Sequence, residues 1–259
     1  MSTASIRTAT ADTLVITRRN LLRIPRAPDL LIGFTVQPVM FVLLFVYVFG
    51  GAIQTPGYDY VDFLMPGIIT QTIAFGGYLT AVGLNEDLRK GLMDRFRSLP
   101  MARSAVLAGR TMADVVMNML ATTLMLGVGY AIGFRFATSV PEILAGIAIL
   151  LLFGYAFSWI FALMGLLSSS PESAGALGFL IVFPLTFVSS AFVPVESMPD
   201  GLQAFAEHNP FTIVVDAVRT LFLGPPADYA VWPAVAWSVG LVAVFAPLAV
   251  WRYRRASST

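Results

Sequence analysis

Six long apolar segments divide this chain of 259 residues, and they limit what the chain can fold into. Each is near the ~20 residues that a helix needs to cross the ~30 Å hydrocarbon core of a bilayer. Charged residues make up only 12% of the chain, against about 25% in a soluble domain, so a water-exposed surface cannot be covered with charge. The sequence therefore predicts an all-α polytopic membrane protein with six transmembrane helices, at residues 30–50, 63–84, 111–134, 143–167, 174–193 and 231–251.

The arginine and lysine residues lie almost entirely on one side of these predicted spans. The N-terminal tail has five, an island of charge at residues 85–110 has six and the C-terminus has three, so this side holds fourteen of the sixteen. The positive-inside rule places it in the cytoplasm. We therefore expect both termini to be cytoplasmic and residues 1–259 to form one transmembrane domain. Its parts are an interfacial N-terminal helix at 1–29, a six-helix membrane domain at 30–251 and a tail at 252–259.

The island at residues 85–110 must lie in water or against a water-facing partner. Within it, Leu88, Leu92, Phe96 and Leu99 recur at the spacing of one helix face, and most charged residues lie off that face. This pattern predicts a short amphipathic helix on the cytoplasmic surface that serves as a docking element. The alternative is a solvated loop.

Two further segments have an amphipathic pattern. Residues 6–24 mix leucine with arginine and stop before Pro25, which predicts a helix in the cytoplasmic interface, with a mobile tail as the alternative. Residues 211–222 predict a helix about 18 Å long, which is too short to span and is expected to dip into or lie flat on the outer leaflet. On this helix Asp216 and Arg219 are one turn apart and can pair.

Residues with catalytic or metal-binding potential are scarce. No G-x-x-x-x-G-K-[ST] loop is present, and the single lysine, Lys90, lies in the island, so the chain has no recognisable ATP site. There is no cysteine and one histidine, His208, which excludes thiolate and multi-histidine metal sites within one chain. Asp114 is expected to pair with Arg110, four residues earlier. We expect no enzyme activity and no cofactor in this chain itself.

The run from Gly91 to Arg110, GLMDRFRSLPMARSAVLAGR, resembles the cytoplasmic motif of ABC type 2 permeases. It is most similar to the daunorubicin/doxorubicin-resistance branch of drug-efflux permeases. The outer-loop runs Phe192-Val193-Pro194 and Asn209-Pro210-Phe211 are similar to that branch as well, and the resemblance covers the whole chain. It implies the permease subunit of an ATP-driven exporter of lipophilic or amphipathic compounds, such as drugs or antibiotics, from the cytoplasm or inner leaflet.

The resemblance also implies partners and roles. The permease would lie in the bacterial plasma membrane, pair with a second copy or a paralogue, and bind two copies of an ABC ATPase subunit that holds ATP and magnesium. Membrane lipid and a lipophilic small molecule would contact it, and nucleic acid would not. By this resemblance residues 85–110 contain the coupling helix, residues 6–24 are the connecting helix, and the loop between spans five and six forms short re-entrant helices. The implied coupling residues are Glu86, Asp87, Gly91, Leu92, Arg95, Phe96, Pro100 and Arg103.

Permeases of this family build their substrate path mainly from spans one, two and five at the subunit interface. In this sequence each of those spans carries phenylalanine residues, joined by a glutamine in spans one and two, and the residues of each set are spaced by four, which places each set along one helix face. Aromatic faces with few amides suit a flat amphipathic molecule better than a sugar chain. The expected path residues are Gln37, Phe41, Phe45, Gln71, Phe75, Phe179, Phe183 and Phe187.

Other functions stay open at this point. An ion-gradient-driven secondary transporter or channel is disfavoured because spans two, four, five and six have no carboxylate and no inverted repeat is visible. A membrane scaffold without transport would not explain the ordered island. Within ABC exporters, lipid or glycan could replace the drug. A co-purifying ATPase with a phosphate loop would discriminate between these classes.

Overall fold

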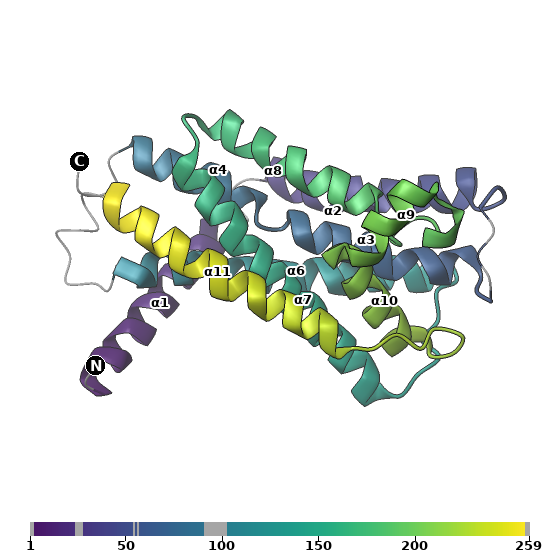
Figure 1. The fold of residues 1–259 in the computed structure, drawn as a ribbon. Coiled ribbons are helices and arrows are strands. Elements are labelled where there is room, and N and C mark those ends of the chain that lie inside the picture. The colour runs from purple at the N-terminus through teal and green to yellow at the C-terminus, as the bar shows by residue number, and fades with distance from the viewer. Residues whose placement is uncertain (1–2, 24–27, 54, 56, 91–102, 257–259) are drawn as a thin grey trace.

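The computed structural model describes residues 3–23, 28–53, 55, 57–90 and 103–256, and every regular element within them is helical. Figure 1 shows an elongated bundle with both chain ends near one end and α10 near the other. Within these described ranges, four helical stretches are long and apolar enough to cross a membrane, and two apolar helices are shorter. These features agree with the predicted all-α polytopic membrane protein.

The N-terminal segment is the helix α1 (Thr3–Arg23), so the helix predicted over residues 6–24 is confirmed as far as Arg23, the last described residue of this segment, and its place in the membrane interface stays a prediction. In Figure 1 α1 extends away from the bundle. It is attached to the start of α6 (Arg103–Ile132), because the Thr17 hydroxyl donates to the Gly109 carbonyl at 3.0 Å. Ile16, which is buried, packs against the same glycine.

The first predicted span consists of α2 (Pro28–Leu44) and a π-helical turn, η2 (Phe45–Phe49). The second predicted span is divided into α3 (Tyr60–Phe75) and α4 (Tyr78–Arg89) by two glycines. A Cβ atom on Gly76 would overlap the amide oxygen of Asn118, so the backbone at this break approaches α6 more closely than another residue would allow.

The island of charge is not a single helix in the part that the structure describes. Its first residues, 85–89, end α4, and its last residues, 103–110, form the first turns of α6. Residues 91–102, on which most of the predicted coupling helix falls, lie outside the described residues.

Three more long helices complete the bundle: α7 (Val140–Leu167), α8 (Pro171–Phe187) and α11 (Trp232–Ala256). α8 ends six residues before the end of the predicted fifth span. The Asn209 side chain explains this end, because its Nδ2 donates to the carbonyls of Leu185 and Val188 at 2.6 Å each. Carbonyls in the last turn of a helix need such a partner.

A short helical turn, η3 (Val195–Ser197), and two helices, α9 (Asp200–His208) and α10 (Pro210–Leu223), connect α8 to α11. α10 confirms the helix predicted over residues 211–222. Asn209 begins it, because its Oδ1 accepts a hydrogen bond from the Phe211 amide at 2.9 Å. One asparagine thus ends α8 and starts α10.

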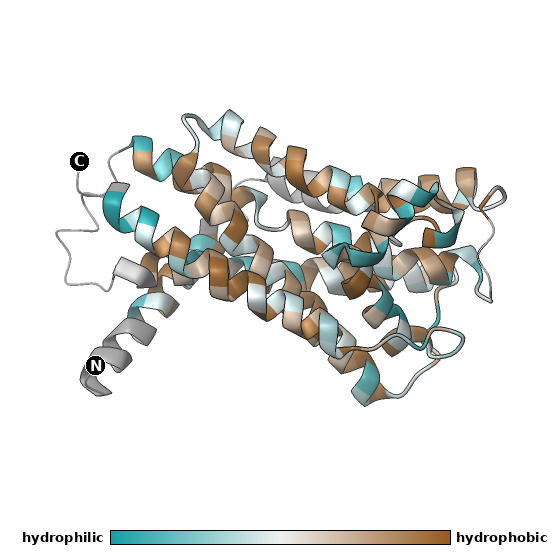
Figure 2. Ribbon diagram, in the orientation of Figure 1, coloured by the Kyte–Doolittle hydropathy of each residue, from teal (hydrophilic) through white to brown (hydrophobic). Residues whose placement is uncertain are grey.

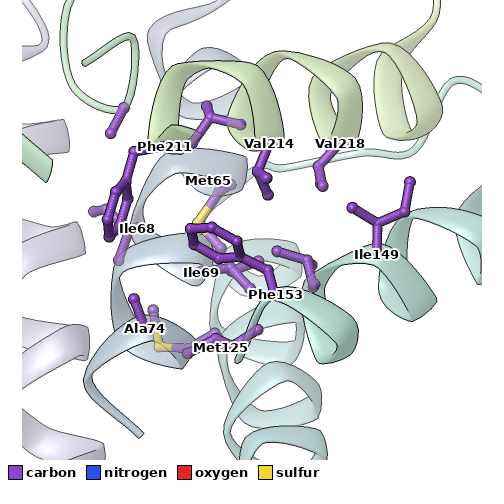
Figure 3. Packing of buried hydrophobic residues seen from close by; sticks show 14 of the residues in the cluster. Met65, Ile68, Ile69, Ala74, Met125, Ile149, Phe153, Phe211, Val214 and Val218 are labelled. Atoms are coloured by element: carbon purple, nitrogen blue, oxygen red, sulfur yellow. The ribbon is translucent and has the colours of Figure 1, made fainter. Parts of the chain in front are cut away.

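The core lies between α3, α7 and α10 (Figure 3). Phe153 and Phe157 of α7 are buried, and the Phe211 ring of α10 meets both edge-on, at 5.2 and 5.3 Å between centroids. Val214 and Val218 of α10 are also fully buried. The apolar face of α10 and most of its polar residues are therefore enclosed by protein. Its expected position in or on the outer leaflet stays a prediction.

The outer faces of α6, α8 and α11 are apolar. Leu120 and Leu180 are more than half exposed, and Trp251 is half exposed. Figure 2 shows brown, hydrophobic residues along the middle of α8 and α11, with hydrophilic residues gathered toward their ends. Apolar surface of this extent is expected against lipid.

Candidate substrate path and coupling site

Seven phenylalanine rings contact one another in series between α2, η2, α3 and α8, and we call them the phenylalanine ladder. Six are the phenylalanines that the sequence predicts for the substrate path. Successive centroids lie between 4.3 and 6.1 Å apart, close to the range of favourable aromatic pairs. In order, the ladder consists of Phe41, Phe45, Phe192, Phe187, Phe183, Phe179 and Phe75.

Phe192 joins the two halves of the ladder, and sequence reasoning did not place it in the path. Its ring lies 4.7 Å from Phe45 and 4.9 Å from Phe187. It follows Phe187 by five residues rather than four because α8 ends at Phe187. A search for residues spaced by four could not find it, although a search for nearby aromatic residues could have.

The ladder has the shape of an arch. α2 and α8 both run from the end of the bundle that carries the termini toward the opposite end (Figure 1). Phe41 and Phe179 therefore lie at the feet of the arch, and the buried Phe192 lies at its apex. The two predicted amides are not part of the arch: Gln37 is exposed, Gln71 is half-buried, and neither hydrogen-bonds to another described residue.

The backbone at the apex is held by α3. The Tyr60 hydroxyl donates to the Phe192 carbonyl at 3.1 Å. Gly67 lies about two turns further along the same face of α3. It allows α3 to approach the backbone of Ala191 closely, since a Cβ atom there would overlap that backbone. These two contacts position Phe192 between α2 and α8.

The predicted pair of Asp216 and Arg219 on α10 is confirmed. Both residues bind Ser190, so they hold the segment that carries Phe192 from the side opposite α3. Arg219 Nη1 lies 2.5 Å from Asp216 Oδ1, and Arg219 Nη2 donates to the carbonyls of Phe63 and Ser190 at 3.0 and 2.9 Å. The Ser190 hydroxyl donates to Asp216 Oδ1 at 2.7 Å. Burial raises the pKa of Asp216, and the charge of Arg219 opposes this rise.

The predicted coupling residues fall in three places. Glu86 and Asp87 lie in the last turns of α4, and Arg103 is the first residue of α6. Glu86 pairs with Lys90 at 3.1 Å on the surface. The remaining residues predicted for coupling lie outside the described residues: Gly91, Leu92, Arg95, Phe96 and Pro100.

Asp87 differs from Glu86 because it is buried. Its Oδ2 lies 2.9 Å from Arg110 Nη1 of α6 and 3.9 Å from Arg19 Nη2 of α1. The expected pair of Arg110 with Asp114 is therefore replaced by the pair with Asp87. Asp114 instead accepts a hydrogen bond from the Thr80 hydroxyl at 2.7 Å.

Asn85 ties the same end of α4 to α7. Its Nδ2 donates to the carbonyls of Gly165 and Ser168 at 3.1 and 2.6 Å. Together, Asn85 and Asp87 connect the end of α4 to α1, α6 and α7. The segment that enters the predicted coupling region is thus anchored to three helices, which the local sequence pattern did not indicate.

Among the residues that the structure describes, no group of three or more His, Asp and Glu side chains could hold a metal ion. The ion pairs of Asp87 join α4 to α6 and α1, whereas the pair of Asp216 and Arg219 lies within α10.

Comparison with known proteins agrees with this architecture. Residues 11–223 match the family described as "ABC-2 type transporter". The daunorubicin resistance ABC transporter permease protein DrrB1 of Streptomyces coeruleorubidus is 35% identical over 247 residues, which are 95% of this chain and 87% of that protein. The probable doxorubicin resistance ABC transporter permease protein DrrC of Mycobacterium tuberculosis is 28% identical over 250 residues, 96% of this chain and 90% of that protein.

A more distant relative is the putative transport permease ycf38 of Cyanophora paradoxa, 24% identical over 215 residues, which are 82% of this chain and 74% of that protein. The family match covers most of the chain, including the second half of α1, the ladder, the end of α4 and α10. The relatives in Streptomyces and Mycobacterium are aligned over nearly the full length. The chain therefore belongs to the ABC-2 type transporter family and is a permease of the ABC transporter class.

Proposed function

We propose that this chain is the transmembrane subunit of an ATP-driven exporter that moves lipophilic or amphipathic compounds out of the cytoplasm or the inner leaflet. Two relatives named for resistance to daunorubicin or doxorubicin, aligned over nearly all of the chain, support a drug-like substrate. The phenylalanine ladder is the observation on this chain that carries the proposal. Stacked aromatic rings offer a planar compound a large contact area and few hydrogen-bonding groups.

The proposed path begins at the feet of the arch. A planar compound would come between the rings of α2 and those of α8, replacing ring-to-ring contacts with ring-to-substrate contacts of the same kind. Phe192 closes the arch at its apex, so outward movement of the substrate requires Phe192 to leave its place between Phe45 and Phe187. The exposed Gln37 and half-buried Gln71 would meet polar groups of the substrate.

Energy would come from a separate ATPase subunit that binds ATP and magnesium. We propose that two copies of it assemble with this permease and with a second permease copy or a paralogue, in a bacterial plasma membrane with the termini in the cytoplasm. Residues 91–102 and the adjacent ends of α4 and α6 would contact the ATPase. The contacts of Asn85 and Asp87 with α1, α6 and α7 would carry movement of that region into the bundle.

The path is tested with alanine variants of half-buried ladder residues. Phe41→Ala, Phe75→Ala and Phe183→Ala should each weaken the apparent affinity of stimulating compounds about tenfold, because burying a large apolar side chain contributes about 1.5–3 kcal/mol. The measurement is drug-stimulated ATP hydrolysis by the complex with its ATPase. Complex yield and basal hydrolysis should stay at the parental level.

The matched control is Phe205→Ala on α9, which removes a half-exposed phenylalanine outside the ladder. It should leave the drug profile unchanged. If the three ladder variants retain the parental profile as well, the ladder is not the path. If no ATPase co-purifies with the unmodified permease or stimulates transport, the exporter proposal itself is wrong.

A further inference from the structure

A cavity of about 510 Å³ opens at the end of the bundle opposite the termini. Its walls come from η3, α9, α10 and the segment before α11, and we call it the outer pocket. Its volume lies within the range of about 300–1,000 Å³ that drug-sized ligands occupy. Ser190 belongs to its wall, so the backbone that carries Phe192 separates the outer pocket from the phenylalanine ladder.

Acidic side chains dominate the charge of the outer pocket. Glu196, Glu207 and Asp216 line it, against a single basic residue, Arg219. The Arg219 guanidinium is already engaged by Asp216, by two carbonyls and by the face of the Phe63 ring, 3.9 Å away. Glu196 and Glu207 are exposed at the rim. A ligand in this pocket therefore meets a negative potential.

The pocket also offers a hydrogen-bond acceptor and an aromatic surface. Both hydrogen bonds that described residues make to the Asp216 carboxylate use Oδ1, and 12% of the side chain is exposed, so Oδ2 is left for a donor. The Tyr229 ring lines the same pocket and is 48% exposed. Carboxylates beside an open aromatic face favour organic cations, through charge attraction and cation–π contact.

We infer that the outer pocket binds amphipathic organic cations of drug size, as a second site separate from the ladder. The positive group of the ligand is held by Glu196, Glu207 and the free oxygen of Asp216, and its planar part lies against Tyr229. The inference rests on the cavity and its charges and does not require that the ladder be the substrate path. For an exporter, such a site would hold a cationic substrate after it passes Phe192.

The test uses the absence of cysteine from the chain. In Ala230→Cys, the new thiol lies in the wall of the outer pocket, and its rate of modification by a cationic methanethiosulfonate reagent is measured in lipid nanodiscs. Rhodamine 6G, a planar aromatic cation, should slow this modification at least fivefold. Fluorescein, which has a similar ring system but negative charge, should not.

Glu196→Gln combined with Glu207→Gln in the same background should raise the rhodamine concentration needed for protection about tenfold, because two nearby charges are lost. Gly201→Cys, exposed on α9 and outside the pocket, is the control and should not be protected. The inference is overturned if rhodamine 6G does not protect Ala230→Cys, or if the double variant is protected equally well. Phe183→Ala should retain protection, and its loss there would assign binding to the ladder instead.

Discussion

Asp87 shows how much depends on the surroundings of a single side chain. It is a buried carboxylate next to a partly exposed one, Glu86, and both are among the predicted coupling residues. The buried pair of Asp87 and Arg110 joins α4 to α6, and the adjacent contact with Arg19 reaches α1. Removing one partner of a buried pair leaves the other charged group without compensation, whereas an exposed pair contributes little.

Asp87→Asn should lower the free energy of unfolding by about 3 kcal/mol, because Arg110 would remain buried without its carboxylate. The measurement is thermal unfolding of the purified permease in detergent. Glu86→Gln, the same change at the neighbouring residue, should lower the free energy of unfolding by less than about 1 kcal/mol. Equal melting temperatures for the two variants would show that the Asp87 pair does not hold the helices together.

At the scale of elements, the contact of α3 with the segment after α8 decides where the ladder closes. Gly67 brings α3 against the backbone of Ala191, and Tyr60 binds the carbonyl of Phe192. On the other side of this segment, α10 contributes Asp216 and Arg219. The apex of the arch is therefore held between two helices, neither of which carries a ladder ring at that point.

Gly67→Ala should destabilise the permease by about 1–3 kcal/mol, because the added methyl group would overlap backbone rather than a movable side chain. It should also change the drug profile by displacing Phe192. Gly127→Ala in α6 is the matched control, since nothing lies within 4 Å of the added atom. That variant should be neutral or more stable by up to about 1 kcal/mol, in line with helix propensity. Equal melting temperatures for the two variants in detergent would show that the close contact of Gly67 with Ala191 does not contribute to stability.

At the scale of the whole molecule, the two ends of the bundle differ in charge. The end with the termini carries most of the arginine and lysine residues of the chain, whereas the opposite end contains the outer pocket with its carboxylates. This asymmetry supports a cytoplasmic location for the termini. The carboxylates of the outer pocket would also give a cationic substrate a favourable electrostatic potential after the substrate has crossed the membrane.

Single cysteines test this orientation in cells. Gly201→Cys on α9 should react with a membrane-impermeant maleimide added outside, because the position is exposed and has open space around it. Ser169→Cys, exposed between α7 and α8 at the end with the termini, should react only after the membrane is permeabilised. The reverse pattern would invert the proposed topology.

Local pattern was sufficient for much of this protein. The apolar segments, the helix at the N-terminus and the helix at residues 211–222 follow from composition and periodicity, because a helix depends mainly on residues within a few turns. The pairing of Asp216 with Arg219 was predictable for the same reason. Six ladder residues could be grouped by their spacing, although whether compounds pass along them stays a prediction.

Other features were decided by contacts between distant segments. Phe192 joins the ladder only because α8 ends at Phe187, and that end depends on Asn209, more than twenty residues later. The sequence determined that this chain forms apolar helices, with basic residues on one side of the predicted spans and acidic residues on the other. Only the tertiary structure decided that α10 lies inside the bundle, that Arg110 pairs with Asp87 and that a pocket forms beside Phe192, since each needs side chains from several helices to meet in space.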